Sequence, residues 1–333
     1  MNDQTKNSIK TDMNIPLVAK KFQPKNDDLI NNLLGKPTRR IFIIPINHYT
    51  NRELEKLIEF YEYSINQNVT FYPKDTKNYS YHNIFRQLQG SDFNVEKAFS
   101  DVVKEIAFKN EKLPFTLTAD IEKVLNSGFV YVHGRDNHFR PLIFMNPGKF
   151  FDLNIPTESW ENVAPFIMEY LINKCIIPGK IENWNIVVDF SEMDMSKIPF
   201  KLKDLFGCIK GIYRCRLYKL FLINMNSVFS FVWNIVKFVI GPTIEAKACK
   251  VETNDGKYDL LFQFINRSQV EKKYGGTAEN LKPGNYFPPD LCAGNFFCKE
   301  ENELENNIVN GNSNIDFVND YDSKEIFYEA LSI

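Results

Sequence analysis

Residue types that commonly carry out chemistry are few in this sequence, and their spacing fits no catalytic pattern. The 333 residues include 4 His and 6 Cys. No two His residues have HExxH, HxxEH or HxH spacing, and no Cys pair has CxxC spacing, so no zinc site is indicated. Neither a GxSxG elbow nor a GxGxxG or Walker loop occurs. The sequence therefore predicts no catalytic residue, no metal and no cofactor, and we expect a protein that is not an enzyme.

Three polar side chains lie where predicted strands meet loops. Asp189 closes the apolar run Trp184–Val188, a position at which α/β proteins often place functional groups. Capping of the following turn is the simpler interpretation, and we favour it. His133 and His138 flank a predicted hairpin turn, and we expect both to contact solvent rather than take part in catalysis.

Composition predicts a large apolar core, and charge is distributed unevenly. Apolar residues make up 44% and aromatic residues 14% of the chain, and the formal net charge is -2. The stretch Lys201–Lys219 holds six Lys or Arg and one Asp, whereas the chain from Lys299 onward holds nine acidic and two basic residues. The basic stretch is either a surface for anionic lipid or phosphate or a solvated helix face. Aromatic residues alternate with aliphatic ones rather than with Lys or Arg, so we expect no nucleic-acid partner.

The start of the chain is polar and carries neither a signal peptide nor a lipidation signal. Together with the scattered Cys residues, this predicts a cytoplasmic protein with reduced thiols.

The stretch Ser227–Lys247 contains the most apolar helix predicted in the chain. Ser230, Asn234 and Lys237 interrupt it at helical spacing and form one narrow polar stripe, and Gly241-Pro242 ends it. So apolar a helix needs a protein core, a membrane or a hydrophobic ligand beside it. A membrane span is disfavoured because the polar residues fall inside the apolar window.

The elements that would position this helix alternate between strands and helices. We expect disorder over residues 1–36, an extended docked segment at Ile41–Ile46, a helix over Arg52–Gln67 and two further helices within Tyr79–Lys112. Strands are predicted at Phe129–Val132, Leu142–Phe144, Trp184–Asp189, Lys219–Ile223 and Ala248–Val251. Helices are predicted from Pro156 to about Cys175, at Ile198–Tyr213 and at Tyr258–Ile265. This alternation indicates an α/β fold with parallel crossovers.

Five separated stretches resemble the CRAL-TRIO lipid-binding family of the Sec-fourteen-like kind, in the family's order. They are FRQLQGSDFNVEKAF (85–99), GRDNHFRPLIFMNPGKF (134–150), IVVDFSEM (186–193), KLFLINMNSVFSFVWNIVKFVIGPTIEAK (219–247) and EKKYGGTAENL (271–281). The resemblance implies an α/β bowl with an N-terminal helical bundle and a mostly parallel sheet that floors an apolar cavity, with helix 229–240 as its gate. The domains expected on this basis are a disordered segment 1–36, an N-terminal extension and helical region 37–115, a lipid-binding domain 116–290 and an acidic, mostly disordered tail 291–333.

The resemblance also implies site residues. The gate and cavity residues would be Phe229, Phe231, Trp233, Ile235, Phe238, Val239, Ile240 and Ile244. The family's members that transfer phosphatidylinositol hold its headgroup at positions that are Ser91, Cys215, Ile244 and Lys247 here, and only Lys247 keeps its type. Phosphate contacts are therefore expected from Lys247, with Arg214, Arg216 and Lys210 nearby.

The function implied is that of a cytoplasmic protein, peripheral at membranes, which extracts a phospholipid into the cavity. Phosphatidylinositol and phosphatidylcholine are both open as ligands. The alternatives are a scaffold of the same fold that binds protein partners through its acidic tail, and a protein that binds another small hydrophobe.

Overall fold

The structure is a computed structural model, and it describes residues 15–71, 80–193, 211–225, 240–252 and 258–291 together with Phe229, Trp233, Asn234 and Lys237. The described residues divide into two compact units. Residues 15–41 and 112–291 form the first, and residues 42–71 and 80–111 form the second. The predicted helix 198–213 lies mostly outside the described residues, as does the tail beyond residue 291. The predicted domain boundaries at residues 36, 115 and 290 stay predictions.

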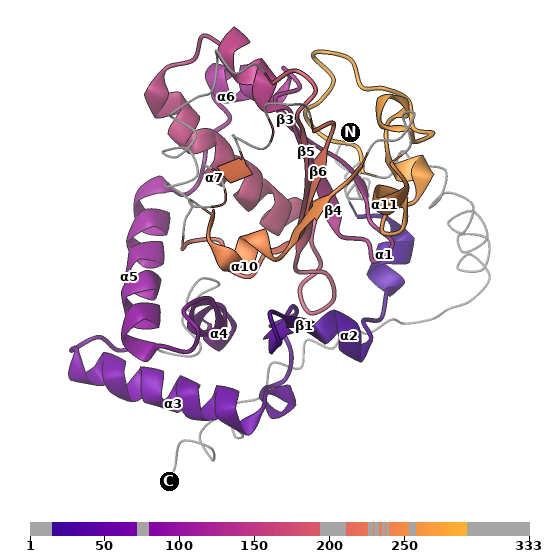
Figure 1. The fold of residues 1–333 in the computed structure, drawn as a ribbon. Helices are drawn as coiled ribbons and strands as arrows, with labels where there is room; N and C mark the ends of the chain where they lie inside the picture. Colours follow the sequence, from indigo (N-terminus) through magenta and orange to yellow (C-terminus); the bar gives the residue numbers. More distant parts are fainter. Residues whose placement is uncertain are drawn as a thin grey trace, which may run out of the picture. The chain divides into compact units, whose positions relative to one another are not determined.

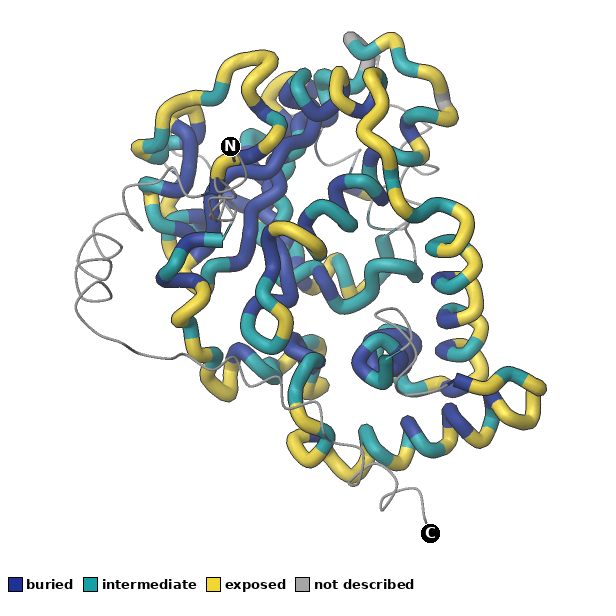
Figure 2. The backbone as a smooth tube through the Cα atoms, turned by 180° about the vertical axis from the view of Figure 1, so that it is seen from behind, coloured by how far each residue is buried: buried dark blue, intermediate teal, exposed yellow. Residues whose placement is uncertain are grey.

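The first unit is built on a five-stranded sheet with the strand order β3-β4-β5-β6-β7 (Figure 1). β3 pairs with β4 in antiparallel fashion, and the remaining neighbours are parallel. Figure 2 shows these strands as the most buried part of the backbone. The strands are β3 (Val130–Arg135), β4 (Pro141–Met145), β5 (Trp184–Asp189), β6 (Leu217–Ile223) and β7 (Ala248–Lys250). The predicted α/β class is thereby confirmed.

Helices cover both faces of this sheet, with α7 and α11 on opposite sides (Figure 1). The helices of the first unit are α1 (Leu17–Lys21), α2 (Asn26–Leu29), α6 (Ala119–Leu125), α7 (Thr157–Lys174), α10 (Pro242–Glu245) and α11 (Asp259–Phe262), and short 3-10 turns are η2 (Pro147–Asp152), η4 (Arg267–Gln269) and η5 (Lys272–Tyr274). α11 is shorter than the predicted helix Tyr258–Ile265.

Alternate residues of each strand point to opposite faces. We name the face that packs against α6 and α7 the α7 face; it carries Val132, Ile143, Ile186, Val188, Leu220 and Leu222. The other, the α11 face, carries Tyr131, Leu142, Phe144, Val187, Phe221 and Ile223. The pairings Ile143↔Ile186 and Val188↔Leu222 keep the α7 face in register across the strands.

The α11 face is covered by residues 251–252 and 258–286, which are fixed to the sheet by hydrogen bonds as well as by rings. The Tyr131 hydroxyl donates to Glu271 Oε2 at 2.5 Å, and the Tyr274 hydroxyl donates to Asp189 Oδ2 at 3.1 Å. Phe144 stacks between the rings of Tyr131 and Tyr274, with both centroid distances 5.4 Å. The cover therefore has directional contacts to three strands.

The described part of the N-terminal segment, from residue 15 onward, forms helices and a hairpin, where disorder was expected over residues 1–36. α1 and α2 are followed by a hairpin of β1 (Ile30–Leu33) and β2 (Lys36–Arg39). Contacts with distant residues hold the segment: Phe22 packs edge-on against Phe139, and Asp28 Oδ1 accepts from Arg140 Nη2 at 3.1 Å. Such contacts span more than a hundred residues and leave no local periodicity.

His133 also differs from expectation. It lies on β3, only 8% exposed, and burial lowers its pKa. His138 is half-exposed, as a solvated residue would be, but its Nδ1 lies 2.6 Å from Asp28 Oδ1. Thus one of the two His residues belongs to the core, because β3 extends through Arg135 and includes the first part of the predicted turn.

The second unit is helical, with η1 (Ile46–His48), α3 (Asn51–Asn66), α4 (Tyr81–Gly90) and α5 (Val95–Lys112). A capping box of Thr50 and Glu53 begins α3. Phe60 packs against Phe99 with ring centroids 6.2 Å apart, and Tyr49 stacks on Phe85 at 4.0 Å. The three helices predicted for this region are confirmed.

Candidate functional site

The candidate site begins with the apolar helical segment 229–240, of which five residues are described, all of them helical. Phe229 and Trp233, one turn apart, are 6% and 8% exposed. Their rings stack at a centroid distance of 5.9 Å, and Phe190 meets Phe229 edge-on at 5.1 Å. Both pack with Leu220 and Leu222 on the α7 face. The segment therefore covers the part of that face formed by β5 and β6.

The polar side of the segment lies away from the sheet. Asn234 is exposed, as the predicted polar stripe requires, whereas Lys237 is partly buried and Ser230 lies outside the described residues. Among the described residues of the segment, no side chain makes a hydrogen bond to the sheet. Ring and aliphatic contacts hold this described part in place, together with Lys250, whose Nζ lies 5.6 Å from the centroid of the Phe229 ring.

The C-terminal end of the segment is open. Gly241 has φ +78° and no atom lies within 4 Å of where its Cβ would be. Ile240 and Ile244 are partly buried against the same apolar cluster as Phe229. The other predicted gate and cavity residues, Phe231, Ile235, Phe238 and Val239, lie outside the described residues.

The predicted phosphate contacts have different surroundings. Lys247 is buried, its Nζ donates to the backbone oxygen of Leu217 at 2.7 Å, and burial together with the nearby Arg40 lowers its pKa to about 8. Arg216 is also buried, but its Nη1 donates to the backbone oxygen of Glu182 at 3.0 Å and holds the turn before β5. Arg214 is partly buried, and Lys210 lies outside the described residues.

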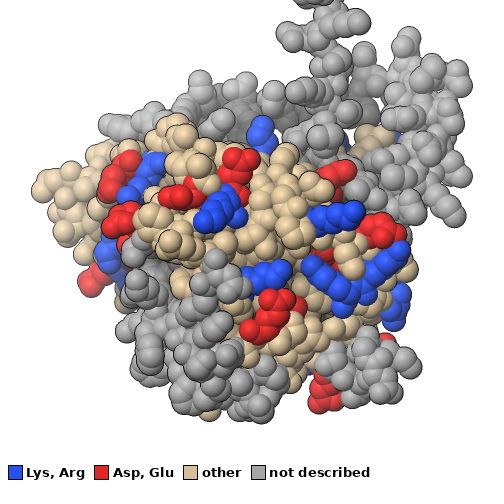
Figure 3. All heavy atoms as spheres, turned by 90° about the horizontal axis from the view of Figure 1, so that it is seen from above, with Lys and Arg blue, Asp and Glu red and all other residues tan. Residues whose placement is uncertain are grey.

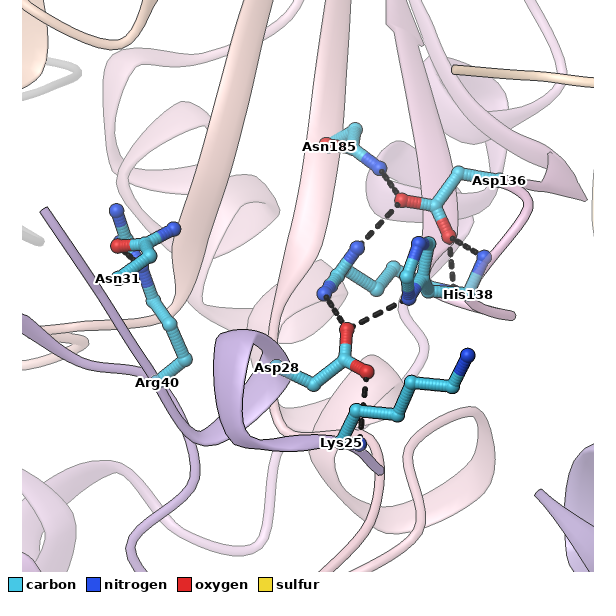
Figure 4. A network of polar contacts seen from close by, with 8 residues as sticks. Lys25, Asp28, Asn31, Arg40, Asp136, His138 and Asn185 are labelled. Atoms are coloured by element: carbon cyan, nitrogen blue, oxygen red, sulfur yellow. Dashed lines mark hydrogen bonds and ion pairs between the residues drawn. The ribbon is translucent and has the colours of Figure 1, made fainter. Parts of the chain in front are cut away.

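Sequence reasoning missed a group of residues around Tyr218 at the start of β6. The guanidinium of Arg140 lies 3.8 Å from the centroid of this ring, and that of Arg40 lies 5.5 Å from it. Arg40 comes from the end of the N-terminal hairpin, and its Nε donates to Asn31 Oδ1 at 2.9 Å (Figure 4). The pair Arg39-Arg40 before an apolar run was the only signal of this group in the sequence.

Surface charge does not single out this group. On the face seen from above in Figure 3, described Lys and Arg side chains are interspersed with Asp and Glu. The cations around Tyr218 differ from these surface Lys and Arg side chains because Arg40 and Arg140 are buried.

Asp189 caps a turn, as favoured from the sequence, and also joins three elements. Its Oδ1 accepts from the Ser191 amide at 2.9 Å and from Asn224 Nδ2 at 2.8 Å. Asn224, at φ +53°, precedes the apolar segment and accepts a hydrogen bond from the Tyr258 hydroxyl at 2.9 Å. Asp189 therefore fixes the point at which the chain leaves β6.

In the part of the chain that the structure describes, no group of three or more His, Cys, Asp or Glu side chains could hold a metal ion. In the same residues, no helix has the length and apolar character needed to cross a bilayer. A small apolar pocket between α7 and β3, lined in part by Leu125, Phe166 and Tyr286, has room for about one water molecule.

The sheet and its two covers define an α/β protein of the CRAL-TRIO fold, and comparison with known proteins agrees. Residues 125–276 match the family model for the CRAL/TRIO domain. The crystal structure of Sfh5 superposes with a TM-score of 0.51 at 10% identity, covering 79% of this chain and 100% of that chain. At that identity the likeness shows the fold alone.

Two curated proteins are similar in sequence. A CRAL-TRIO domain-containing protein of Schizosaccharomyces pombe is 24% identical over 220 residues, which are 63% of this chain and 47% of that protein. The phosphatidylinositol transfer protein CSR1 of Eremothecium gossypii is 24% identical over 169 residues, 50% of this chain and 37% of that protein. The matches thus span about half or less of the relatives' length. Together, these findings place residues 125–276 in the CRAL-TRIO family.

Proposed function

We propose that this protein binds a phospholipid in an apolar cavity between the α7 face and the segment 229–240, and carries it between membranes. The observation that carries the proposal is the burial of Phe229 and Trp233 on Leu220 and Leu222 without a side-chain hydrogen bond to the sheet. A cover held this way can exchange its apolar partner for an acyl chain without breaking directional bonds. The similarity to a protein named as a phosphatidylinositol transfer protein supports the same function.

The energetics of acyl-chain transfer favour a closed site. Leaving a bilayer costs about 0.8 kcal/mol per CH₂ exposed to water, so the acceptor must exclude water along the whole chain. Opening of the segment 229–240 against a membrane surface would give the lipid a continuous apolar path. The protein would then be cytoplasmic and associate transiently with membranes, with Lys247 at the headgroup end.

Lipid extraction and transfer test the proposal. Protein recovered from cells should yield a bound phospholipid by mass spectrometry, and should move labelled phosphatidylinositol or phosphatidylcholine between liposomes. Leu222→Phe enlarges a side chain beneath Phe229 and Trp233, and Ile223→Phe adds the same kind of bulk on the α11 face as a matched control. We expect both variants to lose a similar amount of thermal stability. Lipid transfer should be several-fold slower for Leu222→Phe and unchanged for Ile223→Phe.

An empty protein that transfers neither lipid would contradict the proposal. Recovery of a different hydrophobic molecule would reassign the ligand. If lipid is absent and deletion of residues 291–333 abolishes capture of a protein partner, the scaffold alternative is favoured instead.

A further inference from the structure

The hairpin of β1 and β2 displays an apolar side chain at its tip. The pairing of Leu33 with Lys36 closes the hairpin with a loop of two residues, Leu34-Gly35. Leu34 is 63% exposed, and no atom beyond the chain neighbours lies within 4 Å of where a Cβ on Gly35 would be. The end of the loop is therefore accessible to another molecule.

Leucine is an unfavourable residue at this position in two ways. Leu34 has φ +53° and Gly35 has φ +76°, the left-handed conformations of a tight hairpin turn in which Asn-Gly is the preferred pair. A bulky residue is rare at positive φ, and an apolar side chain left in water adds no stability by burial. Folding alone does not account for Leu34, and strain of this kind points to a contact with another molecule.

The base of the hairpin is fixed, so the tip keeps its position. Arg39 and Arg40, at the end of β2, are 2% and 3% exposed. The Arg40 amide donates to the backbone oxygen of Leu29 at 2.7 Å, and its Nε donates to Asn31 Oδ1 at 2.9 Å (Figure 4). A tip held on a fixed base loses little conformational freedom when it binds.

The chain around the hairpin tip carries positive charge at its surface. In residues 15–41 the exposed charged residues are four lysines and one aspartate, namely Lys20, Lys21, Lys25, Lys36 and Asp27. Figure 4 shows the Lys25 side chain extending away from Asp28, whose carboxylate is used by Arg140 and His138. Because the exposed charge of this segment is mostly positive, it favours an anionic partner.

A second exposed apolar residue lacks these features. Ile65 is 61% exposed, but it lies within the regular helix α3, whose last turn has no basic residue. Single exposed apolar residues of this kind are common on protein surfaces and need no partner. Leu34 differs from Ile65 in its backbone conformation and in the lysine two positions along the chain.

We propose that the tip of the β1–β2 hairpin anchors the protein on anionic membrane surfaces, with the Leu34 side chain among the lipids and Lys36 at the level of the headgroups. A bilayer supplies both an apolar interior for leucine and negative charge for lysine, whereas a soluble anion supplies only the charge. The hairpin lies outside residues 125–276, which match the family model. The inference rests on the proposed function for the need to meet a membrane, and goes beyond it by assigning a surface that docks.

Vesicle binding by the full chain is the first measurement. The protein is sedimented with vesicles of phosphatidylcholine alone, and with vesicles of phosphatidylcholine and phosphatidylserine in equal parts. Leu34→Asn should weaken binding to the mixed vesicles about tenfold, because a leucine side chain is no longer moved out of water. The variant should unfold at the same or a higher temperature, since asparagine adopts positive φ more readily than leucine. Ile65→Asn, the matched control, should leave binding unchanged.

Substitution of the lysines tests the electrostatic part of the anchor. Lys25→Gln together with Lys36→Gln should weaken binding to the mixed vesicles about fivefold per lysine and leave binding to phosphatidylcholine alone unchanged. Lys25→Arg together with Lys36→Arg keeps both charges and should bind as the wild type does. Added salt should weaken binding of the wild type to the mixed vesicles.

Lipid transfer between liposomes, measured in parallel, separates the two proposals. If Leu34→Asn binds vesicles as tightly as the wild type and the wild type transfers phospholipid, the anchor is overturned and the proposed function stands. Binding that depends on Leu34 in a protein that transfers no lipid would support the anchor and contradict the proposed function. If Leu34→Asn dissociates a dimer and leaves vesicle binding unchanged, the tip contacts a second copy of the chain and the anchor is overturned.

Discussion

The two faces of the five-stranded sheet are covered by different kinds of contact. On the α11 face, Tyr274 and Glu271 bond to residues of the strands through buried hydrogen bonds. On the α7 face, the described residues of the segment 229–240 contribute stacked rings and aliphatic contacts, and the Phe229 ring also lies 5.6 Å from Lys250 Nζ. Hydrogen bonds fix position and angle, whereas apolar contacts are non-directional. The cover of the α11 face is therefore fixed to the sheet by directional bonds. The segment 229–240 on the α7 face is held by contacts that we propose a lipid can replace.

Replacing a glycine by alanine in each cover should give the largest difference between the two covers in the free energy of unfolding. A Cβ on Gly276, in the α11-face cover, would lie 1.8 Å from the backbone oxygen of Val270, whereas one on Gly241 would meet nothing within 4 Å. We expect Gly276→Ala to lower the free energy of unfolding by about 3 kcal/mol. Gly241→Ala should cost about 1–2 kcal/mol, from a backbone conformation (φ +78°, ψ 170°) that residues with a Cβ rarely adopt. Urea denaturation measures both, and equal losses would contradict the distinction.

Titration of Lys247 should make phosphate binding depend on pH. Its pKa in the free protein is about 8, below the usual value of 10.5, and a bound phosphate favours the protonated form. Affinity for a phosphate-bearing lipid should therefore fall as pH rises above 8, approaching tenfold per pH unit. Binding assays from pH 7 to 9 measure this.

Two variants control the pH experiment. Lys247→Arg should remove the pH dependence, because arginine stays protonated. Besides Arg40, the Cys215 thiol is the titratable group that acts on the pKa of Lys247. Cys215→Ser removes this thiol and should leave the pH dependence of binding in place. A pH profile that Lys247→Arg leaves intact would speak against Lys247 as the titrating group.

Loss of one hydrogen bond on the α11 face should affect stability but not transfer. Tyr274→Phe leaves Asp189 without one of its three donors and should lower stability by about 1 kcal/mol. Phe229→Leu, in the other cover, should cost a similar amount yet slow lipid transfer several-fold. Thermal unfolding and liposome transfer, measured on both variants, compare the two covers. Slower transfer by Tyr274→Phe than by Phe229→Leu would reverse their proposed roles.

Local sequence patterns predicted the strands of the sheet well, because a strand is indicated by a run of only a few apolar residues and the turn residues beside it. The continuous apolar run closed by Asp189 gave β5 with its observed bounds, Trp184–Asp189. Alternation of strands and helices then predicted the parallel order. The width of the apolar face of Phe229 and Trp233 predicted a partner that excludes water, but left a protein core, a membrane and a hydrophobic ligand open.

Features that depend on distant contacts were not predictable in the same way. α2 has only four residues, and its Asp28 is fixed by Arg140. His133 is placed by the length of β3 rather than by the turn beside it. Arg40 meets the Tyr218 ring only through the packing of the N-terminal hairpin within the first unit. No periodicity in residues 15–41 encodes these partners, so the cation group became visible only in the structure.

Hydrogen exchange with and without vesicles tests the central claim most directly. Backbone amides of residues 229–240 and of residues 258–286 are followed by mass spectrometry while lipid vesicles are added. The account predicts that vesicles speed exchange in residues 229–240 and leave residues 258–286 unchanged. Equal changes in both covers, or none in residues 229–240 while lipid is being transferred, would contradict it.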